Sequence, residues 1–384
     1  MRDLSLYIII LVFSLYAALG ILEKAMHRRH LRNIPLRVLV NGTRGKSTVT
    51  RLIAAMLREA GIRTWGKSTG SQAVILYPDG TEAPYRKPHR LVNIREQIPF
   101  VRRASADEAQ AIVVECMALS PENQRMMGRE FIQPTFTLIT NAWVDHVSEI
   151  GRTEEETVAT LALSVPDAST LITPDRRFET CGKRCAPLIP TAEAEALVPM
   201  FSYEMFPENL QLALTLADLL RIDRETAVRG LLKARPDMGM RGPFRVGLCS
   251  VVNGFAANDV TSAWKLLERA RQGQPRDKTV WLLFNNRADR EFRLSSFLPL
   301  VRRLEEQGAG LRVIGDHAEK AARYFTRNSR IEALPLRQKP EDWVLGLSRE
   351  ACLVFCFGNI RGEGYRFIEA LSQGKGESVC CSKP

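Results

Sequence analysis

The sequence lacks the cysteine and histidine patterns of disulfide-stapled and zinc-binding proteins. Its eight cysteines include no CxxC pair, and none of its five histidines stands at zinc-finger spacing. Neither a disulfide framework nor a zinc site is therefore predicted, and a reducing compartment fits best. Cys352 and Cys356 lie in the apolar run ACLVFCFG, where small buried side chains are the expected interpretation.

Aromatic residues are also few, at 7% of the chain, although the net charge is +11. Basic stretches such as YRKPHR (85–90) are not interleaved with aromatics as in stacking platforms for single-stranded nucleic acid. No nucleic-acid partner is therefore expected. The charge then suits an anionic membrane surface or anionic small molecules and polymers, and a non-catalytic, membrane-tethered polyanion-binding protein ranks last among the functional hypotheses.

No charged residue occurs in the segment 4–22, LSLYIIILVFSLYAALGIL. As a helix it is about 28 Å long, close to the ~30 Å hydrocarbon core of a bilayer. The stretch is longer than a signal-peptide core and no A-x-A site follows it, so we predict one transmembrane helix. Basic residues follow directly, at positions 24, 28, 29, 32 and 37. The positive-inside rule then places the rest of the chain in the cytoplasm.

The remainder of the 384 residues alternates strand-like and helical segments and shows no internal repeat. Buried-strand candidates are the apolar runs 36–40, 111–114, 136–140, 169–173, 280–284, 311–315 and 353–357. The segment 47–61 has helical spacing and ends at Gly61. This alternation predicts the α/β class, with mainly parallel sheets and helices on both faces.

A domain boundary is predicted at RPDMGMRGPF (235–244), where Pro, Gly and Met interrupt the pattern. We expect a central domain over 35–242 with a phosphate-binding loop, a smaller Rossmann-like domain over 243–373, and a flexible tail over 374–384.

A glycine-rich turn, NGTRGKST, stands between the first strand candidate and the following helix. Backbone N–H groups in such a turn wrap a phosphate, the lysine neutralises the outer phosphates, and the serine hydroxyl can hold Mg²⁺. Val40 occupies the place of the first Gly of the full eight-residue motif, so the match is the shorter G-T-x-G-K-S. We predict a phosphate site formed by Gly42, Thr43, Arg44, Gly45, Lys46, Ser47 and Thr48.

Polar residues follow the next strand candidates in turn. Glu115 ends the run 111–114, and Asn141, Asp145 and His146 follow the run 136–140. Doubly wound sheets gather their ligand-binding groups at the carboxyl ends of their strands. A carboxylate there suits Mg²⁺, whereas a lone His is more often structural.

These motifs together resemble the Mur ligase superfamily, and within it the amide-ligase subunit of poly-γ-glutamate synthase, used in capsule synthesis. The resemblance runs over almost the whole chain, in GILEK, NGTRGKSTVTRL, GKSTGS, VVECMAL, TNAWVDHVSEIG, MFPENLQLAL, VVNGFAANDVTS, FNNRADR and FGNIRG. It implies an ATP-dependent acid–amino-acid ligase that uses Mg²⁺. Glutamate and growing poly-γ-glutamate would be its substrates, other membrane subunits of a synthase and export complex its partners, and the bacterial cell membrane its location. Oligomeric state is left open, a homo-oligomer included.

The resemblance also implies roles for single residues. It makes Lys46, Glu115 and His146 catalytic, and Ser47, Glu115 and His146 ligands of Mg²⁺. Asn209, Arg241 and Asn258 would contact ATP, although a solvated surface charge is an equal alternative for Arg241. Helical spacing after Asn209 also predicts that it caps a helix. Substrate contacts are expected from Lys67, Ser68, Thr69, Asp145, Asp259, Arg287, Asp289 and Arg290.

Three departures from the Mur ligases are visible. Residues 153–182 contain no lysine, although many of those enzymes hold a second metal with a modified lysine there. The strand at 36 begins too soon after residue 22 for a UDP-binding domain, so nucleotide-sugar precursors are not expected substrates. Asn253 and Ala257 stand where the family has a ribose-binding Asp and a motif His.

The expected reaction transfers the γ-phosphate of ATP to a glutamate γ-carboxylate, and an amine then attacks the acyl phosphate. The nearest alternative is a γ-glutamyl ligase like folylpolyglutamate synthase, a soluble enzyme with no use for the apolar segment. A hydrolase is the other enzymatic alternative, because residues 66–70 fit G-x-S-x-G. It is disfavoured because a strand-like segment follows where the nucleophile elbow needs a helix.

Overall fold

The computed structural model describes residues 2–71, 73–85, 93–144, 149–201, 203, 205–257, 260–272, 279–375 and 377–378. The chain forms two compact units, of which the first ends at Arg235 and the second begins at Pro236. The predictions made for Asp145, His146, Asn258 and Asp259 lie outside the described residues.

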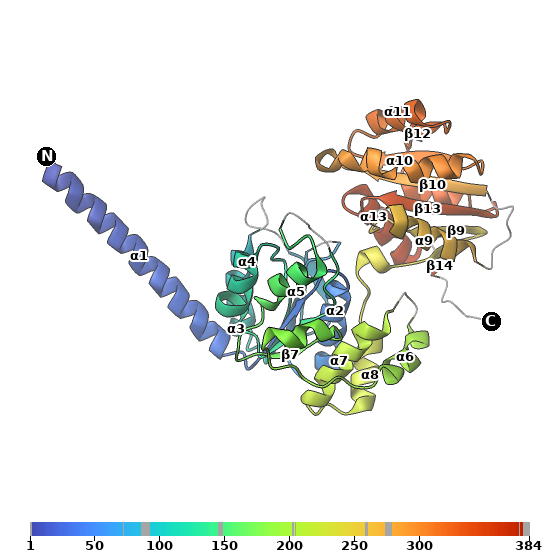
Figure 1. Cartoon of the computed structure of the whole chain (residues 1–384). Helices are drawn as coiled ribbons and strands as arrows, with labels where there is room; N and C mark the ends of the chain where they lie inside the picture. Colours follow the sequence, from blue (N-terminus) through green and yellow to red (C-terminus); the bar gives the residue numbers. More distant parts are fainter. Residues whose placement is uncertain are drawn as a thin grey trace. The chain divides into compact units, whose positions relative to one another are not determined.

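The chain begins with one continuous helix, α1 (Arg2–Arg32) (Figure 1). Its large apolar side chains between Tyr7 and Leu22 are exposed, and the stretch 7–32 is long and apolar enough to cross a membrane. Unlike this exposed apolar part, the basic end of α1 packs on the rest of the first unit, where the His27 Nε2 lies 2.9 Å from the carbonyl of Phe131. The helix therefore continues past the apolar segment 4–22 because its last turns have tertiary contacts.

A seven-stranded sheet organises the first unit, in the order β4-β3-β2-β5-β1-β6-β7. The five strands from β2 to β7 in this order are parallel, and β3 and β4 form an antiparallel edge. The strands are β1 (Leu36–Asn41), β2 (Thr64–Ser68), β3 (Val74–Leu76), β4 (Glu82–Pro84), β5 (Ala111–Glu115), β6 (Phe136–Ile139) and β7 (Thr170–Ile172).

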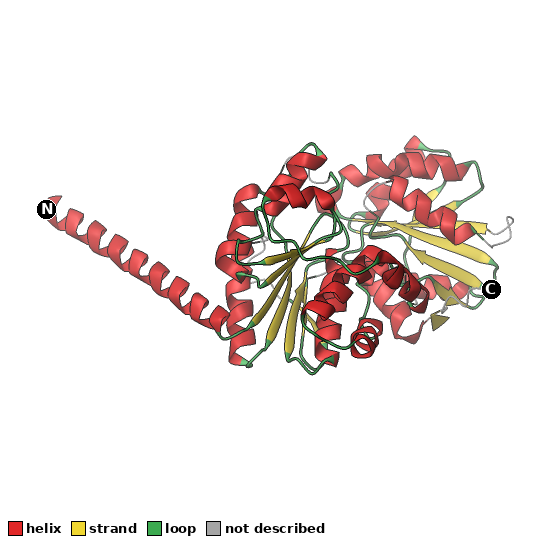
Figure 2. Ribbon diagram, turned by 60° about the horizontal axis from the view of Figure 1, so that its bottom comes forward, coloured by secondary structure: helices red, strands yellow, loops and turns green. Residues whose placement is uncertain are grey.

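Helices cover both faces of this sheet, as Figure 2 shows. They are α2 (Lys46–Glu59), α3 (Gln97–Ala106), α4 (Pro121–Met126), α5 (Glu154–Ala162), α6 (Thr191–Leu197), α7 (Pro207–Leu219) and α8 (Arg224–Leu232). Central strands are buried on both sides, which is why β5 has the apolar run 111–114 and β1 the apolar run 38–40 rather than alternation.

The second unit has its own seven-stranded sheet, in the order β12-β11-β10-β13-β9-β8-β14. β12 to β9 are parallel and β8 and β14 are antiparallel. The strands are β8 (Phe244–Val246), β9 (Cys249–Asn253), β10 (Thr279–Asn286), β11 (Gly310–Gly315), β12 (Ala333–Pro335), β13 (Cys352–Gly358) and β14 (Glu377–Ser378). The helices are α9 (Val260–Arg271), α10 (Phe292–Glu305), α11 (Ala318–Asn328), α12 (Pro340–Gly346) and α13 (Glu363–Ala370).

The predicted α/β class is confirmed, and each of the seven strand candidates overlaps an observed strand. Cys352 and Cys356 are fully buried in β13, as expected of small apolar side chains. β3 lies in the strand-like segment that was expected after residues 66–70. β2, β9 and the short strands β4, β8, β12 and β14 were not among the candidates, because their sequences mix polar and small residues.

Candidate functional site

The glycine-rich turn after β1 forms a tight loop that leads into α2. Gly42 and Gly45 have φ angles of 125° and 85°, a region that side chains disfavour. A Cβ at Gly42 would lie 2.1 Å from the Thr140 Oγ1, and one at Gly45 would lie 2.8 Å from the Asn209 Oδ1. The loop therefore sits against the end of β6 and the start of α7, with no room for side chains at these glycines.

Asn209 lies beside the loop but does not cap its helix, so that prediction is wrong. α7 begins at Pro207, and its cap residue, Phe206, makes no side-chain capping hydrogen bond. Asn209 is the third residue of the helix and is buried. Its amide is therefore held next to Gly45 by the helix.

Asn141 fixes the conformation of the loop from the end of β6. Its Oδ1 accepts hydrogen bonds from the Thr43 Oγ1 at 2.6 Å and from the Arg44 N–H at 3.0 Å. Its Nδ2 donates to the Arg44 carbonyl at 3.1 Å. This strand-end asparagine thus organises the backbone that would wrap a phosphate.

Lys46, the first residue of α2, folds back over the loop. Its Nζ donates to the carbonyl of Gly42 at 2.7 Å and lies 3.3 Å from that of Thr43. The ammonium group therefore stands where it can neutralise the outer phosphates of a nucleotide held by the loop.

Glu115 joins three elements at the same edge of the sheet. The carboxylate is buried at the end of β5 and accepts from the Ser47 Oγ at 3.1 Å, the Ser68 Oγ at 2.8 Å and the Thr69 N–H at 2.6 Å. Carboxylate and hydroxyl oxygens are hard ligands, so Glu115 and Ser47 fit Mg²⁺ beside a phosphate loop. Within the described residues no group of three or more His, Cys, Asp or Glu could hold a metal ion. Mg²⁺ at nucleotide sites usually binds through one or two carboxylates together with waters and phosphate oxygens.

Lys67 is completely buried in β2. Its Nζ lies 3.3 Å from the Glu96 Oε2, 3.4 Å from the Gln97 Oε1 and 4.3 Å from the centre of the Tyr85 ring. The ammonium charge is thus engaged inside the unit, so Lys67 stabilises the strand from which Ser68 reaches Glu115.

Replacement of Lys67 by alanine should lower the free energy of unfolding by about 3 kcal/mol, because it leaves the Glu96 carboxylate buried without its partner. Thermal unfolding followed by circular dichroism measures this. The double variant Lys67→Met/Glu96→Leu removes both charges and should be more stable than Lys67→Ala. Equal stability of Lys67→Ala and the wild type would show that the ion pair contributes nothing.

The G-x-S-x-G segment does not form a nucleophile elbow. Residues 66–68 belong to β2, and the next element in the described chain is the strand β3. The Ser68 hydroxyl donates to Glu115. The hydrolase hypothesis therefore has no support in the structure.

A basic pocket of about 520 Å³ lies at the carboxyl edge of the second sheet. It is lined by residues at and after the ends of β10 and β11 and by residues after β12 and β13. Five of the lining residues are cationic and two are acidic. The cations are Arg287, Arg337, Lys339, Arg361 and Arg366, and the acids are Asp316 and Glu363.

Two buried asparagines form the floor of this pocket. The Nδ2 of Asn285 donates to the Arg361 carbonyl at 2.8 Å, and that of Asn286 donates to the Asp316 carbonyl at 2.7 Å. Both Oδ1 atoms are buried, and neither accepts a hydrogen bond from any residue that the structure describes. The described residues therefore leave these two buried acceptors unsatisfied beneath a cationic pocket.

Arginine side chains crowd one another at this edge. Burial, together with the charges of Arg290 and Arg287, lowers the pKa of Arg293 to about 10. Burial and the same two neighbours also lower the pKa of Arg361. Arg287 lies 2.5 Å from the Asp289 carboxylate, which is itself largely exposed. The positive charges of these arginines repel one another. A bound anion would offset that repulsion, so the site favours anion binding.

Arg241 follows the short turn 238–240 at the start of the second unit. The Asn253 Nδ2 donates to the carbonyls of Met238 at 2.9 Å and Arg241 at 3.1 Å. Asn253 stands where the resemblance to the Mur ligases places a ribose-binding Asp, and in this chain it holds the backbone at Arg241.

The structure brings together Lys46, Ser47, Ser68, Thr69, Glu115 and Asn209 around the loop of the first unit. Arg287, Asp289 and Arg290 lie together in the second unit. Sequence reasoning missed Asn41, whose Oδ1 accepts from the Gly42 N–H at 2.8 Å, and the pocket residues Asn285 and Arg361. For Asn41 and Asn285 the available signal was an asparagine at the end of a predicted strand, β1 and β10 respectively.

Comparison with known proteins gives two domain matches and two long relatives. Residues 40–176 match the Mur ligase middle domain, and residues 245–374 match the poly-gamma-glutamate synthase CapB C-terminal domain. The chain is 33% identical to PGA synthase CapB of Bacillus subtilis, over 96% of this chain and 98% of that protein. It is 35% identical to the capsule biosynthesis protein CapB of Bacillus anthracis, over 74% of this chain and 65% of that protein.

Solved structures share the fold at low sequence identity. E. coli FolC in complex with ADP has a TM-score of 0.62 and 14% identity, over 91% of this chain and 93% of that chain. MurF from Acinetobacter baumannii has a TM-score of 0.54 and 14% identity, over 91% of this chain and 78% of that chain. The near full-length match to a curated relative, with both domain matches in order, shows that this chain belongs to the CapB family of poly-γ-glutamate synthases and has the Mur ligase fold.

Proposed function

We propose that this protein is a membrane-anchored, ATP-dependent amide ligase that joins glutamate residues through their γ-carboxyl groups. The observation that carries the proposal is the arrangement of Lys46, Ser47 and Glu115 around a glycine loop at the carboxyl edge of a parallel sheet. Family membership and the ligand in one shared-fold structure, FolC with ADP, agree with it.

Activation of glutamate is the first step. The loop N–H groups and the Lys46 ammonium would bind the phosphates. Ser47 and Glu115 would hold Mg²⁺, which would supply positive charge to offset the charge of the transferring phosphoryl group. The γ-carboxylate oxygen attacks the γ-phosphorus, ADP leaves, and a γ-glutamyl phosphate forms.

Amide formation is the second step. An amine attacks the acyl carbon, phosphate leaves, and the amine loses a proton. Phosphate is a much better leaving group than the oxide of a free carboxylate, which is why the reaction consumes ATP.

We assign the basic pocket of the second unit to a glutamate substrate. Arg287 and Arg361 line the pocket and can pair with its carboxylates. The proposed roles of Asp289 and Arg290 are to set the charge around this pocket.

Location and partners follow from α1. Its exposed apolar stretch would span the membrane once, and the basic residues after it would keep both units on the cytoplasmic side. One helix cannot form a pore for an anionic product, so other membrane subunits would complete a synthase and export complex.

Hydroxylamine trapping tests the acyl phosphate. Purified protein with ATP, Mg²⁺, glutamate and hydroxylamine should form glutamyl γ-hydroxamate, since hydroxylamine replaces the amine in the second step. Ferric chloride colour and mass spectrometry measure the product. ADP release without any hydroxamate would contradict the intermediate.

A folate-type γ-glutamyl ligase is the second candidate, because FolC shares the fold. It predicts that ADP release with glutamate requires added dihydropteroate or folate. We expect no such requirement, because the apolar helix and the CapB-type second domain point to a polymer substrate.

A further inference from the structure

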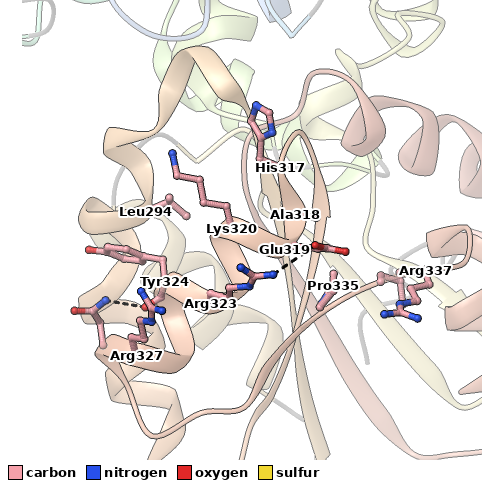
Figure 3. Close-up of a pocket in the computed structure, with 12 residues that line it drawn as sticks. Leu294, His317, Ala318, Glu319, Lys320, Arg323, Tyr324, Arg327, Pro335 and Arg337 are labelled. Carbon is pink, nitrogen blue, oxygen red and sulfur yellow. Dashed lines mark hydrogen bonds and ion pairs between the residues drawn. The ribbon is translucent and has the colours of Figure 1, made fainter.

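A basic groove of about 780 Å³ runs along the outer face of α11 in the second unit (Figure 3). Its other walls are Leu294 in α10 and residues 335–337, at and just after the end of β12. Four lining residues are Lys or Arg and one, Glu319, is acidic; the cations are Lys320, Arg323, Arg327 and Arg337. The reaction proposed above uses none of these side chains, although Arg337 also lines the glutamate pocket.

Internal ion pairs neutralise this groove only in part. The Lys320 Nζ lies 3.0 Å from the Glu291 carboxylate, and an Arg323 nitrogen lies 3.8 Å from that of Glu319. All four side chains are more than half exposed, so solvent weakens both pairs. Arg327 and Arg337 have no acidic partner within the part of the chain that the structure describes.

The cations on α11 are regularly spaced. Lys320, Arg323 and Arg327 lie at i, i+3 and i+7 on the exposed face, while Ala321, Ala322 and Phe325 form the buried face. Their rises along the helix axis are about 4.5 Å and 6 Å. A γ-linked glutamyl unit has five backbone bonds rather than three, so it extends by roughly 6 Å and carries one free carboxylate per unit. The spacing of the cations along α11 is therefore close to the spacing of the carboxylates along an extended γ-linked chain.

The groove adjoins the glutamate pocket, because Ala318, Leu336 and Arg337 line both. Together the two cavities are lined by eight Lys or Arg and three Asp or Glu. α11 has 11 residues and is about 16 Å long, which accommodates about three extended γ-glutamyl units.

We propose that the α11 groove binds a segment of the γ-linked glutamate chain outside the reacting centre and so retains the product between additions. The choice of ligand rests on the proposed function. Tyr324 is the one Phe, Tyr or Trp among the residues that line the groove, whereas a nucleic-acid platform stacks successive bases on several such rings. A carboxylate polymer is therefore favoured over single-stranded DNA.

Direct binding tests this proposal without turnover. A fluorescein-labelled γ-glutamate decamer is titrated with the full-length protein in detergent, without ATP, and anisotropy is recorded at several salt concentrations. The variant Lys320→Gln/Arg327→Gln should bind about tenfold more weakly than the wild type and show a shallower salt dependence. Its products should also be shorter.

The matched control is Lys265→Gln/Arg269→Gln, which removes two exposed cations from α9 in the same unit. Its decamer affinity should stay within about twofold of the wild type. Equal losses in both double variants would overturn the proposal, since they would reflect net charge alone. Tighter binding of a DNA oligonucleotide of equal charge, lost in the groove variant, would overturn it as well.

Failure of the groove is distinguishable from failure of the ligase assignment. If wild-type protein releases glutamate-dependent ADP while the groove variant binds the decamer normally, the groove proposal falls and the ligase stands. Loss of decamer binding in the groove variant alone supports the groove whatever the ADP assay shows.

Discussion

The variant Lys46→Ala should lose glutamate-dependent ADP release by roughly a thousandfold, the size of effect seen when a charge-stabilising group is removed from a reaction centre. In the wild-type structure the Lys46 ammonium lies 2.7 Å from the Gly42 carbonyl, directly over the loop. Alanine keeps the helix but removes the charge that offsets the negative charge of the transferring phosphoryl group. A coupled assay for ADP measures the loss.

Lys233→Ala is the matched control for this variant. Lys233 is an exposed lysine of the first unit, 2.6 Å from the Glu59 carboxylate and remote in sequence from the loop. It should retain near wild-type turnover, and both variants should remain in the membrane fraction. Near-normal turnover of Lys46→Ala would contradict the assignment of the phosphate site.

The variant Glu115→Gln should reduce ADP release by about a hundredfold or more and raise the Mg²⁺ concentration needed for half-maximal rate. The carboxylate accepts hydrogen bonds from Ser47, Ser68 and Thr69. The amide has nearly the same shape but lacks the negative charge, and its NH₂ cannot accept from these donors. The variant would therefore lose the proposed metal ligand and part of the support of β2.

Glu122→Gln removes an exposed carboxylate from α4 and should leave the Mg²⁺ dependence unchanged. A Glu115→Gln enzyme with the wild-type Mg²⁺ dependence would show that Glu115 does not hold the metal. Thermal unfolding of both variants separates this effect from loss of the fold.

The parts of the fold that the sequence predicts are those with local causes. β1 and β5 lie between two helical layers, so the short apolar runs 38–40 and 111–114 are sufficient to identify them. The loop is also local, because its glycines, lysine and hydroxyl stand within a few residues. The α/β class and the loop between strand and helix could therefore be predicted.

The parts that sequence reasoning missed depend on distant partners. β2 contains Lys67, which is stable in the interior only because Glu96 and Gln97 lie against it. Asn209 looked like a cap, but its position beside Gly45 depends on how α7 packs on the loop. The crowding of Arg287, Arg290 and Arg293 arises where β10 and β13 end side by side. No local pattern specifies these contacts.

The central claim is that this chain ligates glutamate at the expense of ATP. Its most direct test uses the purified full-length protein in detergent with ATP, Mg²⁺ and either D- or L-glutamate, scored for ADP and for γ-linked product. The account predicts that at least one enantiomer stimulates ADP release, that γ-linked oligomers accumulate with it, and that Lys46→Ala abolishes both. Absence of glutamate-stimulated ADP release with both enantiomers would contradict it.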